Sequence, residues 1–243
     1  MLEPGFDLLY RSPRVLAALK PAGLATQAPP GIESLEARIK AWLREESADY
    51  SGYLAVPHRL DRPVSGAMVF ATHPNAARKI SRQFERRQVR KVYWACLERQ
   101  VQPAEGTWTD HVRKVYGHPR AEIVAADHPE GRLAILHYRT LAEAAWGVWL
   151  EVVLETGRTH QVRIQASSRG HPILGDVFYG ATSAFGTPHE DERLRAIALH
   201  GRELAFRDPS TGQDVSVVAP LSDDWRRLGL PPEKAEGGRQ KEE

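Results

Sequence analysis

The chain has almost no cysteine and no long apolar segment. Cys96 is the single cysteine among 243 residues, so no intramolecular disulfide can form, and a thiolate zinc site is not expected. No apolar run approaches the roughly 20 residues that cross a bilayer. Lys20 and Pro21 interrupt an Ala-rich stretch that would otherwise resemble a signal peptide. We therefore expect a cytoplasmic protein with no membrane segment.

Excess charge is also scarce, but its distribution is uneven. The formal net charge is only +2. Between His58 and Ala95 there are nine Lys or Arg and two Asp or Glu, so this segment carries +7 and the rest of the chain −5. Such a block is typical of a surface that binds a phosphate backbone, although a solvated helix face gives the same pattern.

Hydrophobic periodicity predicts one α+β domain over residues 1–230, followed by a disordered polar tail at 231–243. Strands are expected at 8–24 (two short ones), 66–71, 89–97, within 106–154, and at 199–206 and 215–218. Helices are expected at 34–45, at 75–88 with Asn75 as N-cap, and at 159–169 with Gly170 as the stop. The short β runs of 106–154 are spaced like antiparallel meanders, which predicts a mainly antiparallel mixed sheet flanked by helices and loops.

The stretch from His58 to Gly66 places one carboxylate, Asp61, between Arg59 and Arg62 and just before an apolar strand. Nearby cations favour the ionised form of a carboxylate even where water is largely excluded. Such an Asp can act as a nucleophile or base towards an anionic substrate. An isolated Asp in a polar turn is more often a cap or turn former, so this interpretation depends on partners elsewhere in the chain.

Four sequence blocks occur in order along the chain: KPAGL at 20–24, HRLDRPVSG at 58–66, KVYWA at 91–95, and ETGRTHQVR at 155–163, which continues into GHPILGD at 170–176. Together they resemble the RluA family of RNA pseudouridine synthases over about residues 8–225. Many relatives have Thr in place of Val64 and Ala in place of Gly201, departures that leave the charged residues intact.

The resemblance implies that a uridine in RNA is converted to pseudouridine without a cofactor, metal or energy source. Asp61 matches the catalytic aspartate, Tyr93 the tyrosine that lies against the target base, and Arg163 the basic partner of the aspartate. Arg59 matches an arginine near the displaced base. The other predicted substrate contacts are His58, Arg62, Lys20, Arg158, His160, Arg82 and Arg86.

Several of these residues also have a structural interpretation. Tyr93 could be an ordinary strand aromatic, and Arg163 a surface residue of its helix. His58 and His160 are better explained by structural hydrogen bonds than by titration, and Lys20 could simply occupy a turn. The Gly175-Asp176 pair is typical of turn chemistry.

The reaction must break the N1–C1′ bond, turn the uracil and join C5 to C1′. Asp61 could attack the sugar, attack the base or remove a sugar proton, and the sequence does not choose among these. Tyr93 offers a flat face for stacking, worth about 1–3 kcal/mol per base. Its hydroxyl could also relay the C5 proton.

Many relatives carry an N-terminal S4-type RNA-binding domain, and Lys20 lies too near the start for one to fit here. We therefore expect the basic segment 75–91 to hold the RNA, which could be ribosomal or transfer RNA. A monomer without an obligate protein partner is expected. Two other functions fit less well: an inactive RNA-binding module of the same fold, and a glycosidase, for which Glu155 and Asp176 are the only second acids in view.

Overall fold

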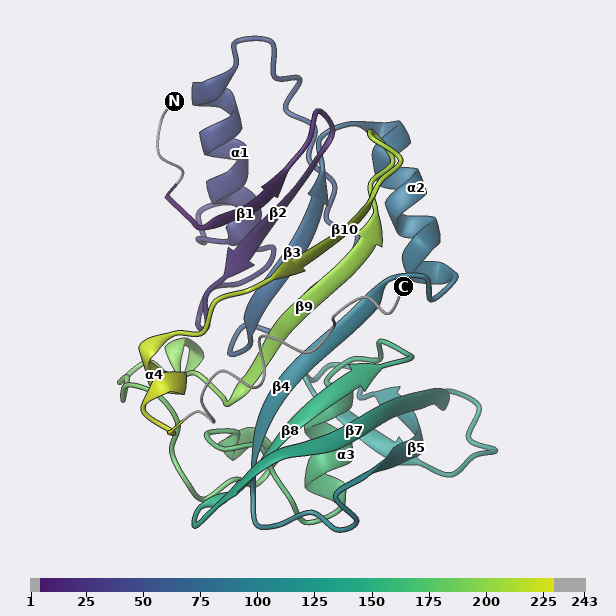
Figure 1. Ribbon diagram of the computed structural model, residues 1–243, viewed down its shortest axis with the longest axis vertical. Coiled ribbons are helices and arrows are strands. Elements are labelled where there is room, and N and C mark those ends of the chain that lie inside the picture. The colour runs from purple at the N-terminus through teal and green to yellow at the C-terminus, as the bar shows by residue number, and fades with distance from the viewer. Residues whose placement is uncertain (1–4, 230–243) are drawn as a thin grey trace, which may run out of the picture.

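The computed structural model describes residues 5–229. The predicted tail at 231–243 lies outside the described residues, as do residues 1–4 and 230. Ten strands form one sheet in the order β1-β2-β3-β9-β4-β8-β7-β5-β6, with β10 paired to β9 (Figure 1). The strands are β1 (Leu8–Arg11), β2 (Val15–Lys20), β3 (Ser65–Ala71), β4 (Arg90–Glu98), β5 (Glu105–Lys114), β6 (Ala121–Val124), β7 (Arg132–Ala144), β8 (Gly147–Leu154), β9 (Leu199–Arg207) and β10 (Asp214–Val218).

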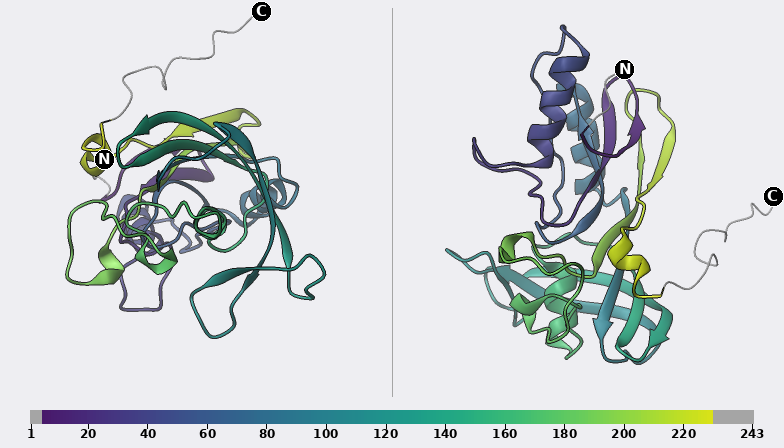
Figure 2. Two further views of the ribbon diagram at one scale, coloured as in Figure 1. Left: turned by 90° about the horizontal axis from the view of Figure 1, so that it is seen from below. Right: turned by 90° about the vertical axis from the view of Figure 1, so that its left-hand side faces the viewer.

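Within residues 5–229, the neighbouring named strands pair antiparallel except β3 and β9, which pair in parallel through two residues each. The helices are α1 (Leu35–Glu46), α2 (Pro74–Glu85), α3 (Gln161–Ser168) and α4 (Asp223–Arg226), with short 3-10 turns η1 (Val177–Tyr179) and η2 (Glu192–Leu194). Strands β1–β3 lie in the upper part of the molecule and β5–β8 in the lower part, as Figure 1 and the right-hand view of Figure 2 show. The predicted α+β domain with a mainly antiparallel mixed sheet is confirmed.

Alternate residues of β2 enter two different cores, because successive side chains of a strand point to opposite faces. Leu16 and Ala18 pack in a core that contains the buried residues of α1. Val15 and Ala17 pack in a second core that contains Ile80 of α2. Both faces of β2 are therefore buried. No helix within residues 5–229 combines the length and apolarity needed to cross a membrane.

The predicted first helix is confirmed. Ser34 is its N-cap, and its side chain accepts a hydrogen bond from the backbone N–H of Ala37 (3.2 Å). This satisfies one of the donors that the first helical turn leaves unpaired. Leu35, Ile39 and Leu43 are buried on one face, as their spacing predicts.

The ends of the second and third helices differ from the prediction. α2 is capped by His73, not Asn75, because the His73 side chain accepts the N–H of Asn75 and Pro74 takes the first helical position. Arg87 has φ +58°, a left-handed conformation that ends the helix before the predicted residue 88. α3 begins at Gln161 because His160 is itself left-handed (φ 53°).

The junction between β3 and β9 positions the candidate aspartate. Gly66 has φ +140°, and a Cβ there would lie 2.4 Å from the backbone nitrogen of Gly201. Only glycine allows the two strands to approach this closely. Beyond Gly66 the strands separate, and the segment before Asp61 fills the gap: Ala55 pairs with Ala71, and His58 Nε2 accepts the N–H of Val69 (3.0 Å).

Candidate active site

The loop from His58 to Val64 is held through hydrogen bonds of its backbone groups. The hydroxyl of Thr26 donates to the carbonyl of Leu60 (2.8 Å) and accepts the N–H of Leu60 (3.2 Å). The N–H of Val64 bonds to the carbonyl of Asp61 (3.0 Å), which closes a tight turn. The Asp61 side chain therefore projects from a fixed turn just before β3.

Lys20 supports this loop, and its surroundings do not favour the predicted contact with substrate. It is fully buried, and its ammonium donates to the carbonyls of Pro21 (2.9 Å), Leu24 (2.7 Å) and Arg62 (3.1 Å). Burial lowers the pKa of Lys20 to about 7, and the charge of Asp61 opposes that shift. A buried cation with three acceptors holds the loop and is closed to a phosphate.

Asp61 shares one guanidinium with a second carboxylate. Arg163 Nη1 lies 3.3 Å from Asp61 Oδ2, while Nε and Nη2 of Arg163 donate to both oxygens of Asp176 at 2.7 and 2.8 Å. The side chains of Arg163 and Asp176 are 6% and 1% exposed, compared with 18% for Asp61. Burial alone would lower the pKa of Arg163, but its bonds to Asp176 and the charges of Asp176 and Asp61 raise it.

The division of these contacts leaves Asp61 the less engaged carboxylate. Asp176 uses both oxygens in a bidentate pair, the strongest geometry between an arginine and a carboxylate. Asp61 contacts Arg163 through Oδ2 alone and at a longer distance (3.3 Å), and within residues 5–229 its Oδ1 accepts no hydrogen bond. The predicted pairing of Asp61 with Arg163 is confirmed, whereas the interpretation of Asp176 as turn chemistry missed its part in this network.

His160 approaches the same aspartate from the N-terminus of α3. Its Nε2 lies 3.5 Å from Asp61 Oδ2, and its Nδ1 lies 2.9 Å from the hydroxyl of Tyr179. The same hydroxyl accepts the N–H of Ala121 (2.9 Å) and donates to the Ala121 carbonyl (3.3 Å). Burial lowers the pKa of His160, which favours the neutral ring.

Tyr93 enters the site from β4. It pairs with Gly201 of β9 next to a β-bulge, and a Cβ on Gly201 would lie 3.7 Å from the Tyr93 ring. Bulges re-aim side chains and are frequent beside active sites. Burial and then the charge of Asp61 raise the pKa of Tyr93, so its phenol stays protonated at neutral pH.

Asp61, Tyr93 and Arg163 all line one cavity of about 480 Å³. Four further cations line it: Arg59, Arg87, Lys91 and Arg158. Arg158 donates to the carbonyl of Leu133 (2.8 Å), and Arg87 pairs with Glu155 (2.5 Å). Burial and then the charges of Arg87 and Arg158 lower the pKa of Lys91, as expected in a crowded cationic pocket. The cavity suits a polyanion that carries a flat apolar group.

The other residues predicted to contact substrate do not all line the cavity. His58 lines the cavity, but its Nε2 is used by Val69, its ring stacks on Phe84 (4.7 Å), and burial lowers its pKa to about 3. It is a neutral structural histidine. Arg62 offers its backbone carbonyl to Lys20 and to the N–H of Gly23, and its side chain is outside the cavity lining. Arg82 and Arg86 line a separate groove.

Sequence reasoning missed Asp176, Tyr179 and Lys91 as members of this site. Asp176 and Lys91 lie inside two of the quoted sequence blocks, and that position was the available sign of their role. No local pattern shows that Asp176, which follows α3 in the chain, folds back to contact Arg163 of that helix. Tyr179 lies beyond the blocks and is recognisable only through its contacts.

Comparisons with known proteins identify one family. Residues 14–168 match the family model described as RNA pseudouridylate synthase. The chain is 34% identical over 225 residues to an uncharacterized RNA pseudouridine synthase of Mycobacterium bovis, covering 90% of this chain and 70% of that protein. It is 31% identical over 230 residues to the ribosomal large subunit pseudouridine synthase D of Xanthomonas campestris, covering 91% and 68%.

The fold matches as well. The solved structure of human RNA pseudouridylate synthase domain containing 4 superposes with a TM-score of 0.74 at 21% identity, covering 91% of this chain and 92% of that one. The matched segment contains Asp61, Tyr93 and Arg163, and the resemblance inferred from the ordered blocks is confirmed. The chain belongs to the family of RNA pseudouridine synthases, which are isomerases.

Proposed function

We propose that this chain isomerises uridines in RNA to pseudouridine in the cavity lined by Asp61, Tyr93 and Arg163. The observation that carries the proposal is the shared guanidinium: Arg163 is fixed by Asp176 and only lightly engages Asp61. A positive group held rigidly beside a carboxylate keeps it charged in a cavity that substrate closes to water. The second oxygen of Asp61 is left to meet the nucleotide.

The overall chemistry is internally balanced. The N1–C1′ bond breaks, the uracil turns, C5 bonds to C1′, the hydrogen on C5 leaves as a proton, and N1 gains one. Asp61 acts either as a nucleophile towards the sugar or base or as the base that takes a sugar proton. Each route requires the ionised carboxylate, and none requires a redox partner.

Tyr93 is proposed to lie against the target uracil. Base–aromatic stacking contributes about 1–3 kcal/mol per base, which helps to offset the few kcal/mol of unstacking a target nucleotide. Arg59 is exposed at the cavity and is the candidate to fill the space that the base leaves. Arg158 and His160 are proposed to contact the flanking phosphate and to orient Asp61, respectively.

The proposed substrate is ribosomal or transfer RNA. The name of the Xanthomonas relative refers to the ribosomal large subunit, which supports the first of these for that protein. The cytoplasmic location and the monomeric state stay predictions.

The test is nucleoside analysis of RNA incubated with the wild type and with Asp61→Asn, which keeps the shape and removes the charge. We expect pseudouridine with the wild type and a rate at least ~10²-fold lower with Asp61→Asn, the lower end of what a positioned base contributes. Asp223→Asn, on a carboxylate whose side chain is 75% exposed, is the matched control and should match the wild type.

The products separate the rival functions. Equal pseudouridine from wild type and Asp61→Asn would remove Asp61 from the mechanism. Binding of RNA without product would favour the inactive RNA-binding module. Release of free uracil without isomerised nucleotide would favour the glycosidase.

A further inference from the structure

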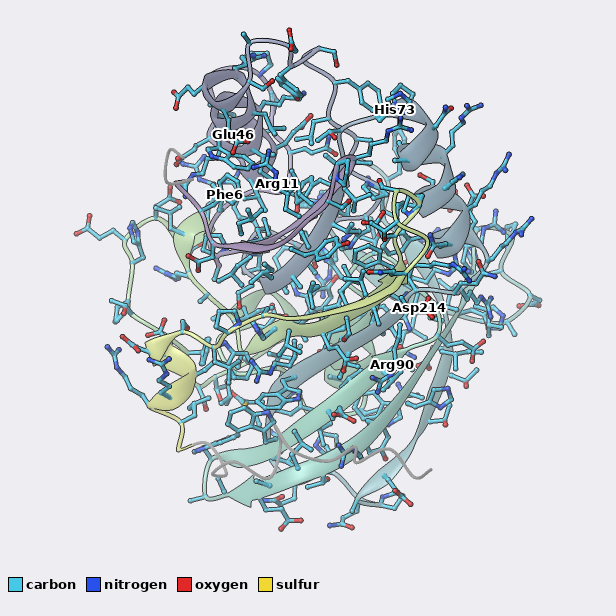
Figure 3. All side chains as sticks on the ribbon, turned by 45° about the horizontal axis from the view of Figure 1, so that its top comes forward. Phe6, Arg11, Glu46, His73, Arg90 and Asp214 are labelled. Carbon is cyan, nitrogen blue, oxygen red and sulfur yellow. The ribbon has the colours of Figure 1, made fainter. Side chains whose placement is uncertain are left out.

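A basic groove lies beside the active-site cavity, on the outer side of α2. It has a volume of about 640 Å³ between α2 and the strands β9 and β10. Five cations line it: Lys79, Arg82, Arg86, Arg90 and Arg207. In Figure 3, side chains tipped with nitrogen extend from α2 into solvent, and the labelled Arg90 and Asp214 lie on the strands next to it.

Most of this positive charge is uncompensated. Arg90 pairs with Glu203 (3.0 Å). Within residues 5–229, none of Lys79, Arg82, Arg86 and Arg207 forms an ion pair. Asp214 is the single acidic residue in the lining. The groove therefore attracts an anion with several charges.

The groove is held in shape by hydrogen bonds between the side chain of Gln83 and the backbone of Arg207. Gln83 donates from Nε2 to the carbonyl of Arg207 (2.8 Å) and accepts the N–H of Arg207 through Oε1 (2.8 Å). This pair fixes the last turns of α2 against the end of β9. Lys79, Arg82 and Arg86 then follow one face of α2 and its C-cap over about 10 Å, from the rise of about 1.5 Å per helical residue.

The groove and the active-site cavity share one wall. Within the segment 83–91, Phe84, Arg87 and Lys91 line the cavity, whereas Gln83, Arg86 and Arg90 line the groove. A strand whose target nucleotide sits in the cavity would pass the end of α2. We propose that this groove binds the phosphate backbone of the RNA segment that flanks the target uridine, an inference that rests on the proposed function.

An RNA backbone fits the groove better than a protein surface does. The core of a protein interface is depleted of charged residues and is built on exposed apolar anchors. Here the cations dominate, and the aromatic residue in the lining, Phe206, is only 3% exposed. Repeated phosphates match a row of cations along a helix, and this binding would be independent of base sequence.

The test is the salt dependence of binding to a labelled single-stranded oligouridylate about 20 nucleotides long, longer than the usual single-strand site size. Four unpaired cations predict a slope of log affinity against log salt of about −3, so doubling the salt should weaken wild-type binding at least about sevenfold. For Arg82→Gln/Arg86→Gln, the same doubling of salt should weaken RNA binding by a factor about 2.6 times smaller than for the wild type, because two phosphate contacts account for about 1.4 of the slope.

The matched control is Arg38→Gln/Arg44→Gln, which removes the same charge from α1, a helix that lines neither the groove nor the active-site cavity. It should keep the wild-type salt dependence. Equal salt dependence in the two double variants would overturn the proposal. That result is also expected if the groove binds an acidic protein in place of RNA. Absence of RNA binding by the wild type would also overturn it. Pseudouridine formation by the wild type is measured separately, so that failure of the proposed isomerisation is distinguished from failure of the groove.

Discussion

Asp176 offers the sharpest test of how the active site is built. Its two oxygens bond to Arg163 at 2.7 and 2.8 Å, and its side chain is 1% exposed. Asp176→Asn keeps the shape but turns one acceptor into an N–H that faces the guanidinium. Removing one partner of a buried ion pair costs about 3–5 kcal/mol, because the other charge is left uncompensated. Since Asp61 still lies 3.3 Å from Arg163, we expect a loss near the lower end, about 3 kcal/mol.

Urea unfolding of four proteins measures this contribution: wild type, Asp176→Asn, Arg163→Met and the double variant. The double variant should be less destabilised than the sum of the single changes, with a coupling free energy of roughly 2 kcal/mol, within the range for residues in direct contact. Asp223→Asn breaks an exposed pair with Arg226 and should cost less than about 1 kcal/mol. Additive single changes would show that Asp176 does not hold Arg163.

The same variant should also lose activity. Without Asp176, Asp61 is the one carboxylate within residues 5–229 that still pairs with the guanidinium of Arg163, and a tighter pair engages the carboxylate that must react. We expect kcat to fall in Asp176→Asn even where the protein is fully folded. An unchanged kcat would show that the Arg163–Asp176 ion pair does not contribute to catalysis.

Three further outcomes follow from local contacts. Gly66→Ala should destabilise the fold by at least about 1–3 kcal/mol, because φ is +140° and the Cβ meets backbone at 2.4 Å, whereas Gly201→Ala meets only ordinary contacts at 3.6 Å or more; thermal melting compares them. Burial lowers the pKa of His200 to about 4, so between pH 6.5 and 4 the unfolded state binds a proton that the native state does not. The free energy of unfolding should therefore fall as pH drops through this range, by up to ~1.4 kcal/mol per pH unit from this residue. Urea titrations of His200→Gln should show a weaker pH dependence. Tyr179→Phe should cost about 1–3 kcal/mol in urea unfolding, because the N–H of Ala121 loses its acceptor; an unchanged midpoint would contradict this.

Much of the fold could be predicted from local patterns. The face formed by Leu35, Ile39 and Leu43 and the cap Ser34 define α1, and the short β runs of 106–154 do form an antiparallel meander. Helix ends were less accurate. His73 competes with Asn75 for the cap of α2, and the left-handed His160 delays α3, neither of which propensity alone reveals.

The proximity of Asp61, Tyr93 and Arg163 followed from the ordered blocks, but the burial of their neighbours did not. Lys20 is polar and lies in a turn-like sequence, which predicts a substrate contact or a turn residue and not a buried side chain. Its burial depends on three carbonyls brought together by two loops about forty residues apart in sequence. Asp176 likewise meets Arg163 only through the path of the chain after α3. Long-range polar contacts of this kind have no local signature.

The most direct measurement is release of the C5 hydrogen from RNA labelled with tritium at C5 of uridine, under single turnover. Because C5 must lose its hydrogen when it bonds to C1′, release reports the isomerisation itself. The wild type and Asp223→Asn should release tritium at the same rate, and Asp61→Asn should release it at least ~10²-fold more slowly. Equal release by Asp61→Asn would contradict the assignment of the reacting carboxylate to Asp61.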